Sequence, residues 1–224
     1  MTFLRWISWV FGPAILASIM ACSGPSQKEQ HQHGGSSTDG LPVLGQQAGQ
    51  DGPTTIPDFR LVNQYGDTIS QQDLEGKVYV ADFFFATCPT ICPKMTRQLL
   101  RVHEVYREQP DVVLLSHTID PEHDSVAVLR EYAERHGVAR GSGWHFLTGS
   151  QDRIYELAED YYMVAASEDS TAPGGYAHSG AFILIDRQDR IRGYYNGTDP
   201  EDVDRLIADI RKLLPVAKSA AYAP

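Results

Sequence analysis

A long apolar strand that runs directly into a pair of cysteines is the feature that most constrains this chain. Residues 77–85 read KVYVADFFF, a nearly continuous run of β-branched and aromatic side chains that is typical of a strand buried on both faces. Cys88 and Cys92 follow, and residues 93–107 then carry apolar side chains at helical spacing. A strand with two buried faces must be covered on both sides, so we expect an α/β fold.

Strands and helices alternate along the rest of the chain. Further strands are predicted at residues 58–62, 68–70, 111–118, 144–147, 161–166, 181–185 and 190–195. Further helices are predicted at residues 124–136, 151–160 and 199–214, and a loop rich in Gly, Ser, Pro and Asp at residues 167–176. This order predicts a central mixed sheet with helices on both faces. A cysteine pair after the first long strand is the arrangement of a thioredoxin-like domain.

The two cysteines lie four residues apart, where the strand meets the helix. Helical spacing brings side chains four apart to one face, so both sulfurs can address a common point. Exposed N–H groups and the positive end of the helix dipole favour thiolates there. These features predict either soft-metal binding or a reversible disulfide between Cys88 and Cys92. A proline directly after each cysteine argues against two ordinary core residues.

Two thiolates alone leave a soft metal ion under-coordinated, so a third ligand is expected, and histidine is the natural choice for copper. His178 stands in a Gly-rich segment, residues 174–180 (GGYAHSG), directly before the strand predicted at 181–185. In thioredoxin-like folds the loop before that strand packs against the cysteine loop, and glycines permit a close approach. We predict His178 as a metal ligand, with a structural or acid–base role as the alternative. His117 and His145 fall at strand ends and are predicted to be structural.

The N-terminal residues are typical of an export signal followed by a lipid attachment site. Residues 6–20 are uncharged and follow Arg5, as in the apolar core of a secretory signal peptide. Residues 19–23 (IMACS) resemble a bacterial lipobox that ends at Cys22, although Met20 departs from the usual small residue. We predict a lipoprotein signal peptide at residues 1–21 and lipidation of Cys22, with an uncleaved membrane anchor as the alternative. Either reading places the protein on the extracytoplasmic (periplasmic) side of a membrane.

Residues 22–55 contain few large apolar side chains and are predicted to form a flexible linker, because they cannot bury enough surface to offset the entropy of ordering. His31 and His33 in this linker could bind a metal ion loosely, although a solvated polar segment is the simpler interpretation. The folded domain is expected at residues 56–214 and a C-terminal tail at 215–224. The net charge of −10 argues against a nucleic-acid partner.

Together these residues resemble the Sco/SenC family of copper-binding proteins, which are assembly factors for the Cu(A) centre of cytochrome c oxidase. The resemblance extends over residues 56–214 and rests on DFFFATCPTICPKM (82–95), DPEHD (120–124), WHFLTG (144–149) and AHS (177–179). It implies that Cys88, Cys92 and His178 bind copper as Cu(I) or Cu(II). For Asp120 it implies a supporting role beside a ligand, since a carboxylate is a poor direct partner for Cu(I).

The resemblance also implies partners and a reaction. The protein would deliver copper to subunit II of cytochrome c oxidase or another copper acceptor, or reduce its cysteines, and a thioredoxin-like reductant would act on the Cys88–Cys92 disulfide. Oxidation of the pair would release the metal. A thiol–disulfide oxidoreductase that uses the same two cysteines is the main alternative. Three residues between the cysteines, and His178 in place of a proline, count against it. A thiol peroxidase is a weaker alternative.

Overall fold

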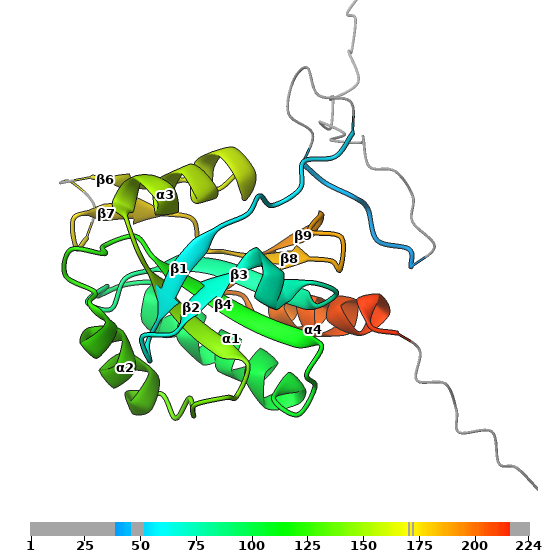
Figure 1. The fold of residues 1–224 in the computed structure, drawn as a ribbon, viewed down its shortest axis with the longest axis horizontal. Coiled ribbons are helices and arrows are strands. Elements are labelled where there is room, and N and C mark those ends of the chain that lie inside the picture. The colour runs from blue at the N-terminus through cyan, green and yellow to red at the C-terminus, as the bar shows by residue number, and fades with distance from the viewer. Residues whose placement is uncertain (1–38, 46–51, 170, 172, 216–224) are drawn as a thin grey trace, which may run out of the picture. The chain divides into compact units, whose positions relative to one another are not determined.

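The computed structural model describes residues 39–45, 52–169, 171 and 173–215 (Figure 1). The predicted signal peptide, Cys22, His31, His33 and residues 216–224 of the predicted tail lie outside these residues, so the predictions made for them stay predictions. No helix within the described ranges is long and apolar enough to cross a membrane.

A seven-stranded mixed sheet forms the centre of the domain, in the order β2-β1-β5-β4-β3-β8-β9. Its strands are β1 (Arg60–Asn63), β2 (Thr68–Ser70), β3 (Val78–Phe84), β4 (Val112–Thr118), β5 (Trp144–Thr148), β8 (Ala181–Ile185) and β9 (Ile191–Asn196). β3, β4 and β5 are parallel, and the other strands run antiparallel to their neighbours. Phe84 lies opposite Thr118 in the β3–β4 register, so the segments that follow these two strands begin side by side.

Helices cover both faces of the sheet. The helical elements are α1 (Cys92–Tyr106), α2 (Val126–Arg135), α3 (Gln151–Glu156) with the π-helical turn η2 (Leu157–Tyr161), α4 (Pro200–Leu213) and the short 3-10 turn η1 (Gln71–Leu74). Figure 1 shows α1, α2 and α4 on one face and α3 on the other. α1 and α2 share a face because the crossovers from β3 to β4 and from β4 to β5 move in the same direction across the sheet with the same hand. The predicted thioredoxin-like α/β fold is confirmed.

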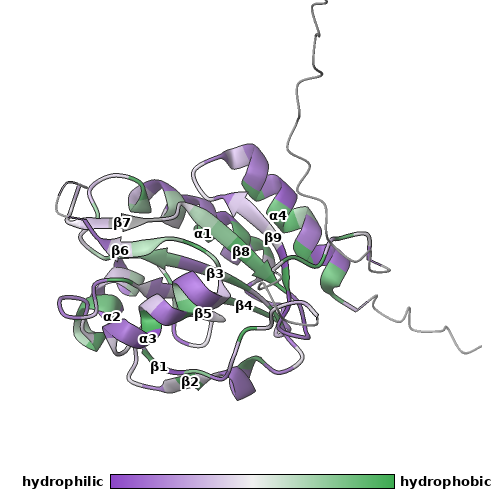
Figure 2. Ribbon diagram, turned by 90° about the horizontal axis from the view of Figure 1, so that it is seen from above, coloured by the Kyte–Doolittle hydropathy of each residue, from purple (hydrophilic) through white to green (hydrophobic). Residues whose placement is uncertain are grey.

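The outer helices are amphipathic, which fixes how they sit on the sheet. Figure 2 shows α4 banded in hydrophilic and hydrophobic colours. Its buried residues are Val203, Leu206 and Ile210, which recur at helical spacing. The Asp199 side chain accepts a hydrogen bond from the Glu201 N–H, and Pro200 occupies the first turn, so the helix begins where its sequence predicts.

β3 is buried along its whole length, as its apolar sequence predicts. The Phe84 ring packs toward α2, with its centroid 5.2 Å from that of Tyr132. The Phe83 ring points to the opposite face, where it stacks on His117 at 5.0 Å and meets Tyr162 at 5.6 Å. Because successive side chains of a strand point to opposite faces, β3 is held from both sides. The loop that follows it therefore starts from a rigid support.

The region between α3 and β8 differs from the prediction. Residues 161–165 do not form a strand; β6 is Ala166–Glu168, and it pairs with β7 (Tyr176–His178) in a separate two-stranded sheet. The predicted loop at residues 167–176 thus contains strand residues at both of its ends. The Tyr162 N–H instead donates to the Leu157 carbonyl at 2.8 Å, and Met163 has a left-handed backbone. The stretch is apolar because side chains such as Tyr162 are buried against the sheet, and burial alone does not require strand pairing.

The described part of the predicted linker contacts β9. The Leu44 N–H donates to the Ile191 carbonyl at 2.8 Å. The Arg192 guanidinium, which is 1% exposed, donates to the carbonyls of Leu41 and Pro42, each at 2.8 Å, and pairs with Asp186 at 2.9 Å. A buried guanidinium needs several acceptors, so these contacts fix residues 41–44 along β9.

Candidate functional site

β3 and α1 bring the two predicted cysteines together. β3 ends at Phe84, shortly before Cys88, and Cys92 is the first residue of α1, whose first turn includes Pro93. Cys88 is 7% exposed and Cys92 is 2% exposed. Both are thiols, and their side chains share a hydrogen bond. The two predicted sulfur ligands are therefore neighbours, and both are almost completely buried.

Cys92 is held as a neutral thiol. Its hydrogen bond with Cys88 is the main cause that raises the pKa of Cys92, and burial acts in the same direction. The helix N-terminus was expected to favour the thiolate, but at Cys92 the neighbouring thiol and the loss of water outweigh it. A cation that displaced the thiol protons would remove this cost, which is the usual coupling between metal binding and proton release.

Asp124 ties the start of the cysteine loop to the end of β4. Its Oδ2 accepts hydrogen bonds from the Ala86 N–H at 2.9 Å and from the Thr118 hydroxyl at 2.5 Å. Asp124 is 1% exposed, and this burial raises the pKa of Asp124 despite the two hydrogen bonds. The carboxylate therefore links the last paired residue of β4 to the segment that follows β3.

Asp120 lies in the same segment but faces a different part of the site. Its Oδ1 accepts a hydrogen bond from the Tyr176 hydroxyl at 2.9 Å and lies 2.8 Å from the Nδ1 of His123. Desolvation, followed by the hydrogen bond to Asp120, raises the pKa of Tyr176, so the hydroxyl keeps its proton and donates. The predicted role of Asp120 beside a metal ligand stays a prediction, and its contacts here are with Tyr176 and His123.

The strand that includes His178 runs beside the cysteine loop. His178 is the last residue of β7 and pairs with Ala166, while its side chain lies outside the described part of the structure. Gly174 has a positive φ, and a Cβ there would lie 2.7 Å from the Phe85 ring and 3.3 Å from Pro89. A Cβ at Gly180 would lie 3.7 Å from the Ile91 side chain. The backbone on both sides of β7 thus approaches the cysteine loop, as the glycines predict.

The other strand histidines are structural, as predicted. His117 is fully buried, its Nδ1 lies 3.3 Å from the Asp82 carbonyl, and burial lowers the pKa of His117 to about 4. Burial also lowers the pKa of His145, whose Nδ1 is 3.3 Å from the Asn63 side-chain nitrogen. Among the described side chains, no three His, Cys, Asp or Glu residues form a metal-binding group. His178, whose side chain is not among those described, stays the predicted third ligand.

Asp124 and Tyr176 shape the site, although no local sequence pattern identifies either of them as a site residue. Asp124 was visible as the second acid of the DPEHD segment, and Tyr176 as the aromatic residue two positions before His178. Their partners, Ala86 and Asp120, are 38 and 56 residues away. No local pattern reveals a hydrogen bond over such a separation.

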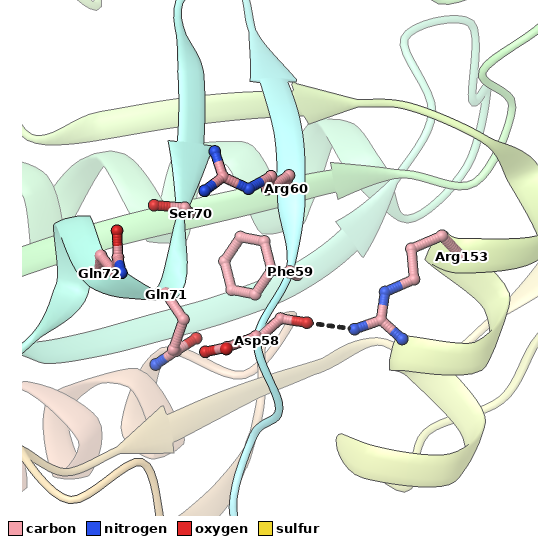
Figure 3. Close-up of a pocket in the computed structure, with 7 residues that line it drawn as sticks. All are labelled: Asp58, Phe59, Arg60, Ser70, Gln71, Gln72 and Arg153. Carbon is pink, nitrogen blue, oxygen red and sulfur yellow. Dashed lines mark hydrogen bonds between the residues drawn. The ribbon is translucent and has the colours of Figure 1, made fainter.

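A cavity of about 370 Å³ lies between β1, η1 and α3 (Figure 3). It is lined by Asp58, Phe59, Arg60, Ser70, Gln71, Gln72 and Arg153. One Arg153 nitrogen donates to the Asp58 carbonyl at 2.5 Å and closes one side of it. None of these residues is a predicted ligand, so the cavity is separate from the thiol site.

Comparison with known proteins gives a consistent result over the same region. The sequence model of the SCO1/SenC family matches residues 47–215. A SCO1/SenC family lipoprotein from Bacillus anthracis is similar in structure, with 29% identity, a TM-score of 0.65, and coverage of 71% of this chain and 95% of that one. The matched region includes the cysteine loop and both sheets.

Two further similar structures describe a disulfide switch in one protein and bound copper in another. BsSco, a member of the Sco family of cytochrome c oxidase assembly proteins in which a disulfide switch was identified, is 30% identical with a TM-score of 0.62, covering 71% of this chain and 93% of that one. ScoI of Arabidopsis thaliana, solved with copper bound, is 25% identical with a TM-score of 0.57, covering 70% of this chain and 98% of that one.

Proposed function

The chain belongs to the SCO1/SenC family, and we propose that it is a copper chaperone that binds copper through Cys88, Cys92 and His178 and assists assembly of the Cu(A) site of cytochrome c oxidase. One observation carries this proposal. Two thiols that share a hydrogen bond lie beside the strand that includes His178, and glycines bring its backbone close to their loop. The copper-bound structure of a similar protein supports the choice of metal.

The proposed donor set suits copper as cargo. Two thiolates and one imidazole are soft or borderline ligands that favour Cu(I), and three ligands leave one side of the ion open to an incoming ligand. Binding would displace the thiol protons of Cys88 and Cys92. At Cys92 the protein favours the protonated thiol. An acceptor with its own thiolates can then take the ion by exchanging one ligand at a time.

The same thiols give the protein a redox-dependent state. When a partner disulfide is the oxidant, Cys88 and Cys92 lose two electrons and two protons and form a disulfide, and the partner disulfide becomes two thiols. The metal then loses two of its three ligands. A thioredoxin-like reductant would return the pair to its copper-binding form. The disulfide switch of BsSco supports this proposal.

We also propose that the protein acts on the extracytoplasmic side of a membrane, held by a lipid on Cys22. Subunit II of cytochrome c oxidase or another copper acceptor would be its partner there. The similarity to a family lipoprotein supports this location. The test is mass spectrometry of the mature N-terminus together with membrane fractionation of Cys22→Ala. A wild-type protein that keeps residues 1–21 and carries no lipid on Cys22 would instead indicate an uncleaved anchor.

The copper proposal is tested by loading the chain that begins after Cys22 with Cu(I) in the presence of a competing chelator. We expect one copper per chain for the wild type, no stoichiometric binding for Cys92→Ser, and weaker binding with a changed Cu(II) spectrum for His178→Ala. His136→Ala, at the end of α2, is the matched control and should bind like the wild type. Unchanged affinity and spectrum in His178→Ala would remove His178 from the site. A protein that bound no copper but rapidly reduced disulfides would be an oxidoreductase.

A further inference from the structure

The hairpin that carries His178 is a small unit outside the central sheet. β6 and β7 have three residues each and form a two-stranded sheet of their own. Two short strands are at best marginally stable alone, so contacts with the rest of the domain must determine where this hairpin lies. Its position sets the distance between His178 and the two thiols.

Tyr176 supplies both an apolar and a polar contact of this kind. Its ring centroid lies 5.2 Å from that of Phe85, at the start of the cysteine loop. Its hydroxyl donates to Asp120 Oδ1 at 2.9 Å, and Asp120 is only 4% exposed. A hydrogen bond to a carboxylate is stronger than one between neutral groups. Tyr176 therefore fastens β7 two residues before His178.

The segment after β4 holds both halves of the site at once. Asp124 accepts the Ala86 N–H of the cysteine loop, and four residues earlier Asp120 accepts the Tyr176 hydroxyl of the hairpin. The two bonds differ in what they hold, since Ala86 directly follows the fully buried β3 of the central sheet, whereas Tyr176 belongs to the separate β6–β7 hairpin. The hairpin is thus the half that can separate without disturbing the sheet.

Building on the copper function proposed above, we propose that the Tyr176–Asp120 hydrogen bond is a latch that keeps the His178 hairpin closed on the cysteine loop, and that its opening controls the release of copper. Opening breaks this bond and the ring contact with Phe85 but leaves the seven-stranded sheet intact, which makes it a local event. Tyr176 is a positioning residue and does not bind copper itself. With the hairpin open, the ion keeps its two sulfur ligands, and a ligand of the acceptor takes the vacated position.

Tyr176→Phe tests the latch, because it keeps the ring and removes only the hydroxyl. We expect Cu(I) to pass from the loaded protein to a chelator about tenfold faster, the size of effect expected from losing a hydrogen bond to a charged group. Hydrogen exchange of the β6–β7 amides should increase while that of β3 stays the same. Asp120→Asn, which keeps an oxygen acceptor, should have a smaller effect than Tyr176→Phe.

The matched control is Tyr155→Phe on α3. The Tyr155 hydroxyl donates to the Ile119 carbonyl at 3.0 Å, next to Asp120 but outside the hairpin, so its loss should not change copper release. Equal acceleration in Tyr155→Phe and Tyr176→Phe would show a general loosening and would overturn the latch.

A double-mutant cycle shows whether Tyr176 acts through His178. In the His178→Ala background, Tyr176→Phe should not accelerate release further. The same acceleration in both backgrounds, or no acceleration in either, overturns the latch while the copper function stands as long as the wild type binds one copper. A wild type that binds no copper overturns both proposals.

Discussion

The cysteine loop and the histidine hairpin supply the two halves of the proposed site, but they are built in different ways. The cysteines follow β3, which pairs along seven residues with β4 and is buried on both faces. His178 ends a strand that pairs along three residues within a separate hairpin. The free energy needed to open a segment is set by the buried contacts that are lost. The cysteine loop is therefore fixed by the fold, whereas the His178 hairpin can move separately.

The largest effect is expected in the rigid half. Phe84→Ala removes a buried ring that packs between Tyr132 and Phe146, so the free energy of unfolding should fall by about 3–5 kcal/mol. Urea denaturation measures it, and Val105→Ala on the exposed side of α1 should change little. If Phe84→Ala lowered the free energy of unfolding by less than about 1 kcal/mol, β3 would not be a rigid support for the cysteine loop.

Acid should lower the free energy of unfolding through His117, which stacks on Phe83 of β3. Burial lowers the pKa of His117 to about 4, so below its ordinary value near 6.5 the unfolded chain takes up a proton that the folded protein does not. Stability is therefore lost as the pH falls from about 6.5 to about 4, by about 3 kcal/mol in all. His117→Phe should remove this part of the pH dependence in urea unfolding at pH 7 and pH 4.5. An equal loss of stability between pH 7 and pH 4.5 in His117→Phe and wild type would contradict the prediction.

Two adjacent glycines, Gly174 and Gly175, test whether close packing against Phe85 positions the hairpin. Gly174 and Gly175 both have positive φ, so alanine at either position costs about 1–2 kcal/mol of backbone strain. Only at Gly174 does the new Cβ also meet Phe85, whereas the space beside Gly175 is open. Gly174→Ala should therefore retain Cu(I) less well than Gly175→Ala in chelator competition. Equal retention would mean that close packing on Phe85 does not position His178.

The smallest effect is expected where the hairpin meets α3. The Gln151 side chain donates to Glu168 Oε1 at 2.9 Å on the protein surface, and Glu168→Ala should cost less than about 0.5 kcal/mol. Hydrogen exchange of β6 amides should stay near the wild-type rate. If Glu168→Ala opened the hairpin as much as Tyr176→Phe, the hold on the hairpin would come from α3 and not from Asp120.

Much of the fold follows from local patterns. The long apolar run predicts β3, helical spacing predicts α1, and Asp199 with Pro200 predicts the start of α4, because each signal lies within a few neighbouring residues. The hairpin β6–β7 could not be predicted in this way. The apolar residues before β6 follow the π-helical turn, and Tyr162 and Val164 among them are buried without strand pairing. A three-residue strand also leaves too short a pattern to recognise.

For the site, the sequence by itself determined the cysteine pair and its place at a strand-to-helix junction. It also determined the glycines that let the segment including His178 come close to the cysteine loop. Those features depend on residues that are close in the chain. Only the tertiary structure decided which groups hold the two halves together: Asp124 on the Ala86 N–H, and Asp120 on the Tyr176 hydroxyl. Such bonds form between residues dozens of positions apart, and they exist only after the sheet has brought the ends of β3 and β4 side by side.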